Sequence, residues 1–348
     1  MKSNIKKYGN SMVLLALLIG TFWTIFSKLD VSNFMSTLKN SDPRYLLAGI
    51  VCMLIYWGIE AGILDILLKK VYPETRYWTA FKITLVGQYY SFLTPFASGG
   101  QPAQLYEMKQ DNIPLTGGTA VLVSKFILFQ VTVTIYALLL TLYKLPLIMG
   151  DLKTASTFVF IGLLINTFGL GMIMMIAFNS SKMKIVMSNF ILWLNKVKII
   201  KKPEKHIQRL VVFIDEYDIC LKTYKDDWML TLSLFVASII QVTAFFSITF
   251  FVYKALGLSG ASIYQIITLQ ALLYMAIAFI PSPGTVGAAE AGFALLLGSV
   301  FSAIIIAVAL LLWRGISYYF GLVVCGIFTL CLYTFDRKRK SARRSQTA

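Results

Sequence analysis

The stretch from Thr94 to Glu107 reads TPFASGGQPAQLYE and lies between two long apolar runs. It contains two prolines, an adjacent pair of glycines and several polar side chains, all of which weaken a helix or its insertion into a membrane. The chain as a whole is 57% hydrophobic. A polar break of this kind inside such an apolar chain therefore needs a structural explanation.

Apolar runs that are long enough to cross a bilayer make up most of the chain. An apolar stretch of about 18 or more residues is typical of a membrane-spanning helix. The first run lacks the small-residue cleavage site of a signal peptide, so we expect it to remain in the protein. The sequence predicts an all-α, polytopic integral membrane protein that forms a single domain over residues 1–348. We predict six full crossings, at residues 11–29, 45–68, 115–143, 155–178, 228–253 and 303–334.

The basic residues, which give a formal net charge of +16, lie mainly between and beyond the apolar runs. There they fix the orientation and meet anionic lipid headgroups, so we do not expect a nucleic-acid partner. By the positive-inside rule the N-terminus, residues 180–226 and the tail at 335–348 are predicted to be cytoplasmic. Between His206 and Lys222 apolar residues recur at helical spacing, which indicates an amphipathic helix on the membrane surface or, alternatively, a docking site for a soluble partner.

Two further apolar segments, residues 83–106 and 263–299, are interrupted by proline, glycine and polar residues. If all three basic regions are cytoplasmic, each segment must cross the membrane an even number of times. Kinked helices would explain a lone proline, but two prolines and a Gly-Gly pair are hard to keep helical. We therefore predict two re-entrant, broken-helix hairpins of opposite orientation, as an inverted repeat would produce. Irregular backbone at membrane depth must be buried in protein or line a wet cavity, so the hairpins also indicate a substrate site.

Ionisable side chains are rare inside the predicted spans, and Glu60, Lys125 and Arg314 lie deep within them. The helix rise places Lys125 and Arg314 near the centre of the hydrocarbon core, so something negative should face each of them. A lipid phosphate would suit Arg314 especially, because a planar guanidinium binds phosphate oxygens bidentately. The alternative is internal pairing, Glu290 with Arg314 and Glu60 with Lys125, which would fix helix positions. The sequence leaves both interpretations open.

Two stretches, GQYYSFLTPFASGGQPAQLYEMK at 87–109 and IPSPGTVGAAE at 280–290, resemble the signatures of the lysylphosphatidylglycerol synthase transmembrane-region family, also called the flippase-like domain family. The second signature is roughly P-x-P-G-x-x-G-x-x-E, and the first carries Gly-Gly followed by a polar residue and Pro. Many relatives have an acidic residue where Gln101 stands. The matching residues are Gly99, Gly100, Gln101 and Pro102 in the first stretch, and Pro281, Pro283, Gly284, Gly287 and Glu290 in the second.

The resemblance implies translocation of an anionic or aminoacylated lipid across the bacterial cytoplasmic membrane, best known for lysylphosphatidylglycerol. That lipid makes the cell surface less attractive to cationic antimicrobial peptides. Other relatives are linked to glycolipids or isoprenoid-linked sugars. Two-part relatives carry a soluble aminoacyltransferase domain, which we do not expect in this chain, so phosphatidylglycerol lysyltransferase chemistry would need a separate lipid synthase as partner. The expected partners are therefore a phospholipid or glycolipid substrate and anionic headgroups, with a homo-oligomer left open.

Two other functions compete with a lipid translocase: a lipid-modifying transferase that uses Glu60, Glu107 or Glu290 as acid or base, and a membrane scaffold for a partner synthase. The cysteines have no motif spacing, the only histidine, His206, lies in a basic linker, and no phosphate-binding loop is present. We therefore expect no metal, cofactor or catalytic residue. The candidate substrate-binding residues are Glu60, Gln88, Tyr89, Thr94, Ser98, Gly99, Gly100, Gln101, Lys125, Pro283, Gly284, Gly287, Glu290 and Arg314.

Overall fold

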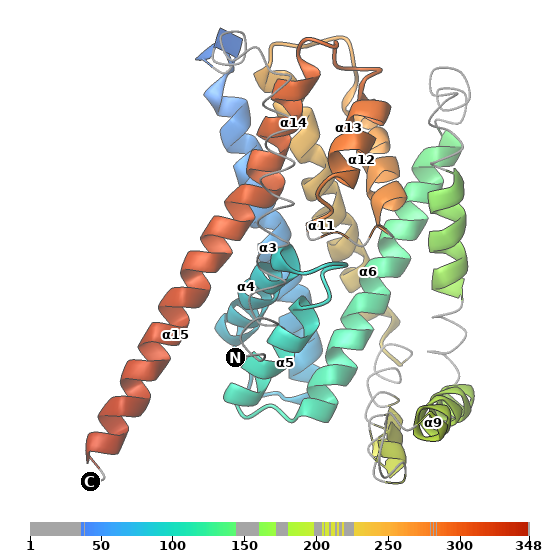
Figure 1. Cartoon of the computed structure of the whole chain (residues 1–348), viewed down its shortest axis with the longest axis vertical. Coiled ribbons are helices and arrows are strands. Elements are labelled where there is room, and N and C mark those ends of the chain that lie inside the picture. Colours follow the sequence, from blue (N-terminus) through green and yellow to red (C-terminus); the bar gives the residue numbers. More distant parts are fainter. Residues whose placement is uncertain are drawn as a thin grey trace.

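The computed structural model describes residues 36–37, 39–143, 160–171, 180–197, 226–278 and 284–346, with single residues or short pieces between 204 and 218 and at 280 and 282. The regular elements of these residues are all helices, and most of them run along one long axis (Figure 1). They confirm the all-α, polytopic class and four of the predicted crossings. Among the described residues, four helices are long and apolar enough to cross a bilayer: Pro43–Val71, Leu115–Tyr143, Trp228–Ala255 and Ile306–Thr334.

The other two predicted crossings lie wholly or partly outside the described residues. Nothing of residues 11–29 is described, and of 155–178 the structure describes a short apolar helix, Phe160–Gly171. This helix approaches another backbone closely, because a Cβ on Gly162 would lie 2.9 Å from the Cα of Ala276.

Helices α3 (Pro43–Val71) and α11 (Trp228–Ala255) form the most extensive helix–helix contact of the described bundle. Each begins after an aspartate whose carboxylate accepts a backbone N–H group of the first turn, at 2.9 Å for Asp42 and 2.9 Å for Asp227. Such a cap satisfies one of the N–H groups that a helix start leaves unpaired. The aspartates therefore define where the two central helices begin.

The first interrupted segment is a helical hairpin. It consists of α4 (Tyr77–Leu93) and α5 (Gly100–Gln110), joined by a turn over residues 94–99. The Thr94 hydroxyl closes the turn: its Oγ1 accepts the Gly99 N–H at 2.8 Å and donates to the Tyr90 carbonyl at 2.8 Å. The hairpin predicted at 83–106 is thus confirmed, and its helices extend beyond those bounds at both ends.

The second interrupted segment is also a hairpin, made of α12 (Ile263–Ile277) and α13 (Ala288–Leu297). Figure 1 shows that the two hairpins enter the bundle from opposite ends and that their tips lie near its middle. The predicted opposite orientation is confirmed. Each hairpin is followed by a helix that carries one intramembrane cation, α6 (Leu115–Tyr143) after the first and α14 (Ile306–Arg314) after the second.

The last predicted span, 303–334, is continuous but not uniformly α-helical. Directly after Arg314 the chain forms a π-helical segment, η1 (Gly315–Phe320), before α15 (Gly321–Gln346) resumes the α-helix. π-Helical turns inside α-helices occur frequently at functional sites. The backbone of the basic tail predicted at 335–348 is helical as far as Gln346.

The basic segment at 180–226 contains a helix, α9 (Ser180–Lys196), that lies before the amphipathic pattern predicted from His206 to Lys222. Figure 1 shows α9 nearly end-on, across the bundle axis, at the end of the bundle from which the first hairpin enters. Of the predicted amphipathic stretch only scattered residues are described, and among these Leu210 and Ile214 are buried against the first half of the bundle.

Candidate functional site

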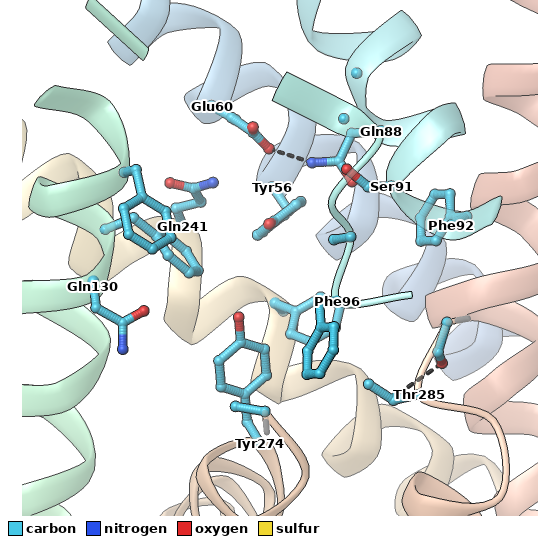
Figure 2. A pocket seen from close by; sticks show the side chains of 18 of the residues that line it. Tyr56, Glu60, Gln88, Ser91, Phe92, Phe96, Gln130, Gln241, Tyr274 and Thr285 are labelled. Atoms are coloured by element: carbon cyan, nitrogen blue, oxygen red, sulfur yellow. Dashed lines mark hydrogen bonds between the residues drawn. The ribbon is translucent and has the colours of Figure 1, made fainter. Parts of the chain in front are cut away.

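A cavity of about 590 Å³ lies between the tips of the two hairpins. Phe96 and Gln101 line it from the first hairpin, and Gly284 and Thr285 line it from the second. Figure 2 shows that side chains from both halves of the bundle point into it. Its volume falls within the range of about 300–1,000 Å³ that is usual for small-molecule sites.

The polar lining of the cavity lies at the boundary between two apolar cores. The buried residues of one core end at Trp57 on α3, those of the other begin at Ile63, and Glu60 lies between them. The two cores also meet on α6 around Gln130 and on α11 around Ser238, in the opposite order along the chain. A polar layer therefore crosses the bundle where the core of the first hairpin meets the core of the second.

Glu60 connects three helices at this layer. Its Oε1 accepts a hydrogen bond from Lys125 Nζ on α6 at 2.8 Å, and its Oε2 accepts one from Gln88 Nε2 on α4 at 2.6 Å (Figure 2 shows the latter). The Lys125 and Glu60 side chains are 14% and 12% exposed. Because an isolated charge at membrane depth is costly, the pair makes both charges tolerable there. The internal pair anticipated from the sequence is present.

Arg314 makes the second anticipated pair, with Glu290. Its Nε donates to Glu290 Oε1 at 2.7 Å, while its terminal nitrogens donate to the Gly284 carbonyl at 3.0 Å and the Thr285 carbonyl at 3.2 Å. The second Glu290 oxygen accepts the Gly287 N–H at 2.5 Å. One ion pair thus holds the irregular backbone that links α12 to α13, where helical hydrogen bonding is interrupted.

Left-handed backbone conformations occur at both hairpin tips. Phe96 and Ala97 have φ of 54° and 53°, and Thr285 has φ of 55°. For residues with a Cβ this conformation costs about 1–2 kcal/mol each. Gly284, with φ of 57°, needs glycine for a second reason, because a Cβ there would collide with the ring of Tyr318. The tips are therefore shaped by the packing around them rather than by local preference.

The cavity brings together only part of the predicted substrate-binding set. Pro283 lies outside the described residues. Thr94 and Gly99 close the first turn instead, and Glu290 contacts Arg314 without lining the cavity itself. The predicted residues that line the cavity are Glu60, Gln88, Gly100, Gln101, Lys125, Gly284 and Arg314. Those that do not are Tyr89, Thr94, Ser98, Gly99, Gly287 and Glu290.

Sequence reasoning missed the uncharged polar side chains of the lining. In Figure 2, Gln241 on α11 lies near Glu60 and Tyr56, and Tyr274 on α12 lies across the cavity from them. Uncharged amides inside apolar runs were the available signal, but only the tertiary structure shows which of them meet. The missed lining residues include Tyr56, Gln130, Asn166, Ser238, Gln241, Gln270 and Tyr274.

Asn166 shows how such an amide stabilises the wall of the cavity. Its Nδ2 donates to the Met275 carbonyl at 3.1 Å and to the Gly162 carbonyl at 3.0 Å, and its Oδ1 accepts from Gln130 Nε2 at 3.1 Å. Met275 is among the last residues of α12, whose terminal carbonyls lack helical partners. Asn166 therefore caps the end of α12 at the cavity.

Glu107, a candidate acid of the transferase interpretation, lies elsewhere. It is 1% exposed on α5 and does not line the cavity; its Oε2 is 3.8 Å from Lys82 Nζ, which also contacts Asp111 at 2.6 Å. The three acids Glu60, Glu107 and Glu290 thus face different basic residues. Among the residues that the structure describes, no group of three or more His, Cys, Asp or Glu side chains is placed to hold a metal ion.

Comparison with known proteins places these features in a family. Residues 11–325 match the family described as the Lysylphosphatidylglycerol synthase TM region, and this range includes both hairpins and every residue that lines the cavity. No curated protein and no solved structure matches the chain significantly. The family match agrees with the two signature stretches and implies a function related to membrane lipid. The chain belongs to the lysylphosphatidylglycerol synthase transmembrane-region family.

Proposed function

We propose that this protein translocates an anionic or aminoacylated membrane lipid, such as lysylphosphatidylglycerol or a related glycolipid, across the bacterial cytoplasmic membrane. The observation that carries the proposal is the cavity between two opposed hairpin tips, with charged and amide side chains in its lining, near the middle of an otherwise apolar bundle. A polar headgroup crosses hydrocarbon only at a large free-energy cost. A cavity at that depth lowers this cost by replacing water with fixed polar groups.

The lining suits a headgroup whose acyl chains stay in the bilayer. Charged and amide groups, among them Lys125 and Gln241, alternate with rings such as those of Phe126 and Phe245. Phe126 is 40% exposed and Phe96 is 58% exposed, so apolar side chains continue from the cavity to the surface of the bundle. In this arrangement the headgroup occupies the polar layer while the hydrocarbon tail follows the apolar rim.

A lipid-modifying enzyme is the weaker candidate for the cavity. Among the described lining residues Glu60 is the one carboxylate, and it already accepts hydrogen bonds from Lys125 and Gln88. No described lining residue is a histidine, so no serine there has an imidazole base beside it. These contacts favour binding and release of a charged group over chemistry on it.

The orientation follows from the basic segments. Lys69 and Lys70 end α3 at the end of the bundle where α9 and the C-terminal end of α15 also lie (Figure 1). In a bacterial cytoplasmic membrane the basic end of a multi-pass protein faces the cytoplasm. We therefore place residues 180–226 and both termini in the cytoplasm, with the first hairpin entering from that side.

Lipid movement by the purified protein in liposomes tests the function. Liposomes containing a headgroup-labelled phosphatidylglycerol are treated with an impermeant quencher. The quencher acts on lipid from the inner leaflet only after that lipid has crossed to the outer leaflet. Gly169→Trp should block movement, because Gly169 lines the cavity and has open space at its Cβ position. Gly171→Trp is the matched control, since Gly171 also has open space but is exposed and does not line the cavity.

Three outcomes separate the candidate functions. Crossing of unaltered lipid by wild type and Gly171→Trp, but not by Gly169→Trp, supports translocation through the cavity. Chemically altered lipid in the extract would support the enzyme. If the lipid neither crosses nor is altered, the proposal is contradicted, and a scaffold for a partner synthase is the remaining candidate.

A further inference from the structure

The two intramembrane cations occupy corresponding places after the two hairpins, but their surroundings differ. The ion pairs are almost equally short, 2.8 Å for Lys125–Glu60 and 2.7 Å for Arg314–Glu290. Both cations line the cavity, whereas only one of the two carboxylates, Glu60, does so. The difference lies in what each pair holds besides its partner.

Arg314 is engaged with the backbone of the second hairpin tip. Besides the bond between them, Arg314 and Glu290 make three hydrogen bonds to the tip backbone, at Gly284, Thr285 and Gly287. The Arg314 side chain is 6% exposed, and the central carbon of its guanidinium lies 5.1 Å from the Trp313 ring centre. If Arg314 turned toward a ligand, the Gly284 and Thr285 carbonyls would lose its hydrogen bonds, and Glu290 would keep only the Gly287 N–H.

In the described structure, the Lys125 side chain makes no hydrogen bond to a backbone carbonyl of either hairpin tip. Among the described residues its ammonium donates to Glu60, which leaves further N–H groups of the ammonium available. Glu60 keeps a second partner, Gln88, at 2.6 Å if Lys125 moves. Exchange of Glu60 for another anion at Lys125 therefore breaks one contact and leaves the surrounding backbone as it is.

We infer that the two cations have separate roles: Lys125 binds the phosphate of the lipid headgroup by exchanging it for Glu60, and Arg314 is a positioning residue that holds the tip of the second hairpin. The inference rests on the proposed function, because it takes the cavity as the headgroup site. The Glu60 carboxylate then competes with the phosphate for Lys125, and the Glu290 carboxylate does not compete.

The two carboxylates supply a matched pair of variants. Glu60→Gln removes the competing charge and should bind dihexanoylphosphatidylglycerol, a water-soluble short-chain lipid, about tenfold more tightly than wild type, since close charge pairs couple this strongly. Glu290→Gln should leave that affinity within about twofold, because Glu290 does not line the cavity. Lys125→Gln should weaken it by about tenfold. Glycerol phosphate, measured in parallel, reports whether a free phosphate binds without the lipid tail.

A second measurement reports the position of the hairpin tip. Ser282 lines the cavity beside the tip, so Ser282→Cys in a background without the native cysteines gives a thiol whose alkylation rate depends on tip exposure. Glu290→Gln and Arg314→Lys should raise that rate several-fold, because both weaken the contacts to the tip backbone. Glu60→Gln and Lys125→Gln should leave it unchanged.

Several results would overturn the inference. Equal tightening by Glu60→Gln and Glu290→Gln would make the two cations equivalent, and tightening by Glu290→Gln alone would reverse their roles. Absence of lipid binding by both wild type and Glu60→Gln would remove Lys125 as the phosphate ligand, and so would binding of glycerol phosphate with no gain from the lipid. Unfolding of Glu60→Gln, seen by gel filtration, would make Glu60 a structural residue and equally contradict exchange. Lipid crossing by wild type is scored separately, so a failed translocase and a failed assignment of Lys125 remain distinguishable.

Discussion

At the scale of single residues, the first hairpin depends on a glycine at the start of α5. A Cβ on Gly100 would collide with the Ser91 hydroxyl and would lie 2.9 Å from the Gly87 carbonyl oxygen, which as backbone cannot rotate away. We expect Gly100→Ala to lower the free energy of unfolding by about 1–3 kcal/mol, as overpacking does. Thermal unfolding of the purified protein in detergent measures the change.

The control for this substitution is Gly62→Ala in α3. Gly62 lies inside a helix and has no atom within 4 Å of its Cβ position. Because Ala is the better helix former, this change should be neutral or stabilising by up to about 1 kcal/mol. If Gly100→Ala were as stable as Gly62→Ala, the close packing of α4 against α5 would be contradicted.

Two alanines of the same hairpin predict stability changes of opposite sign. Ala97 has φ of 53° at the tip, so Ala97→Gly should raise the stability by about 1 kcal/mol by relieving the left-handed strain. Ala103 lies within α5, so Ala103→Gly should lower it by about 0.5–1 kcal/mol. The shift of the unfolding midpoint measures both. A loss of stability in Ala97→Gly would show that the tip is not strained.

Individual charges of the site could be predicted from the sequence, but its amides could not. Glu60, Lys125 and Arg314 stand out because a charge in an apolar run must find a partner, and the partners proposed for them are the ones observed. An amide such as Gln241 or Asn166 is tolerated in many membrane helices. Its role appears only when the facing helix is known, because a single span does not reveal which of its faces meets which neighbour.

At the scale of elements, the end of α12 depends on a neighbouring helix. Asn166, from the helix Phe160–Gly171, donates to the Met275 carbonyl at 3.1 Å. Asn166→Ala should leave that carbonyl without its side-chain donor and lower the free energy of unfolding by about 1–3 kcal/mol. Hydrogen exchange of the α12 amides, followed by mass spectrometry, should become faster near Ile277.

The control removes the other contact of the same asparagine. Gln130→Leu deletes the hydrogen bond to Asn166 Oδ1 but keeps both bonds that Asn166 donates. We expect a smaller loss of stability and unchanged exchange in α12. Equal acceleration in both variants would mean that the wall loosens as a whole, and the capping role of Asn166 would be wrong.

Elements with strong sequence signals were predicted well. The spans at 115–143 and 228–253 agree with the helices Leu115–Tyr143 and Trp228–Ala255, and the hairpin prediction at 263–299 contains α12 and α13. The π-helical turn after Arg314 had no such signal. The turn lies where Arg314 and Tyr318 are held against the second hairpin and against Phe92 of the first.

At the scale of the whole molecule, the two halves have the same order of elements in opposite directions. Each has a long helix, a hairpin and a helix with one cation, and the starts of α5 at Gly100 and α13 at Ala288 lie 188 residues apart. Lys125 and Arg314 are separated by nearly the same distance in sequence. This correspondence supports the inverted repeat predicted from the sequence. The halves have nevertheless diverged at the cations, since only Arg314 contacts a hairpin tip through hydrogen bonds in the described structure.

The orientation of the molecule predicts which of its ends an impermeant thiol reagent reaches. Glu74, between α3 and α4, and Asn189, on α9, are exposed at the basic end of the bundle, whereas Ser259, between α11 and α12, is exposed at the opposite end. In intact cells carrying single-cysteine variants, Ser259→Cys should react, while Glu74→Cys and Asn189→Cys should react only after the membrane is permeabilised, because basic segments are retained in the cytoplasm. Permeabilised cells are the control: a thiol that is buried in the protein stays unlabelled there, whereas a thiol on the cytoplasmic side becomes labelled. Labelling of Asn189→Cys from outside would show that the protein has the opposite orientation in the membrane, with the first hairpin entering from the exterior.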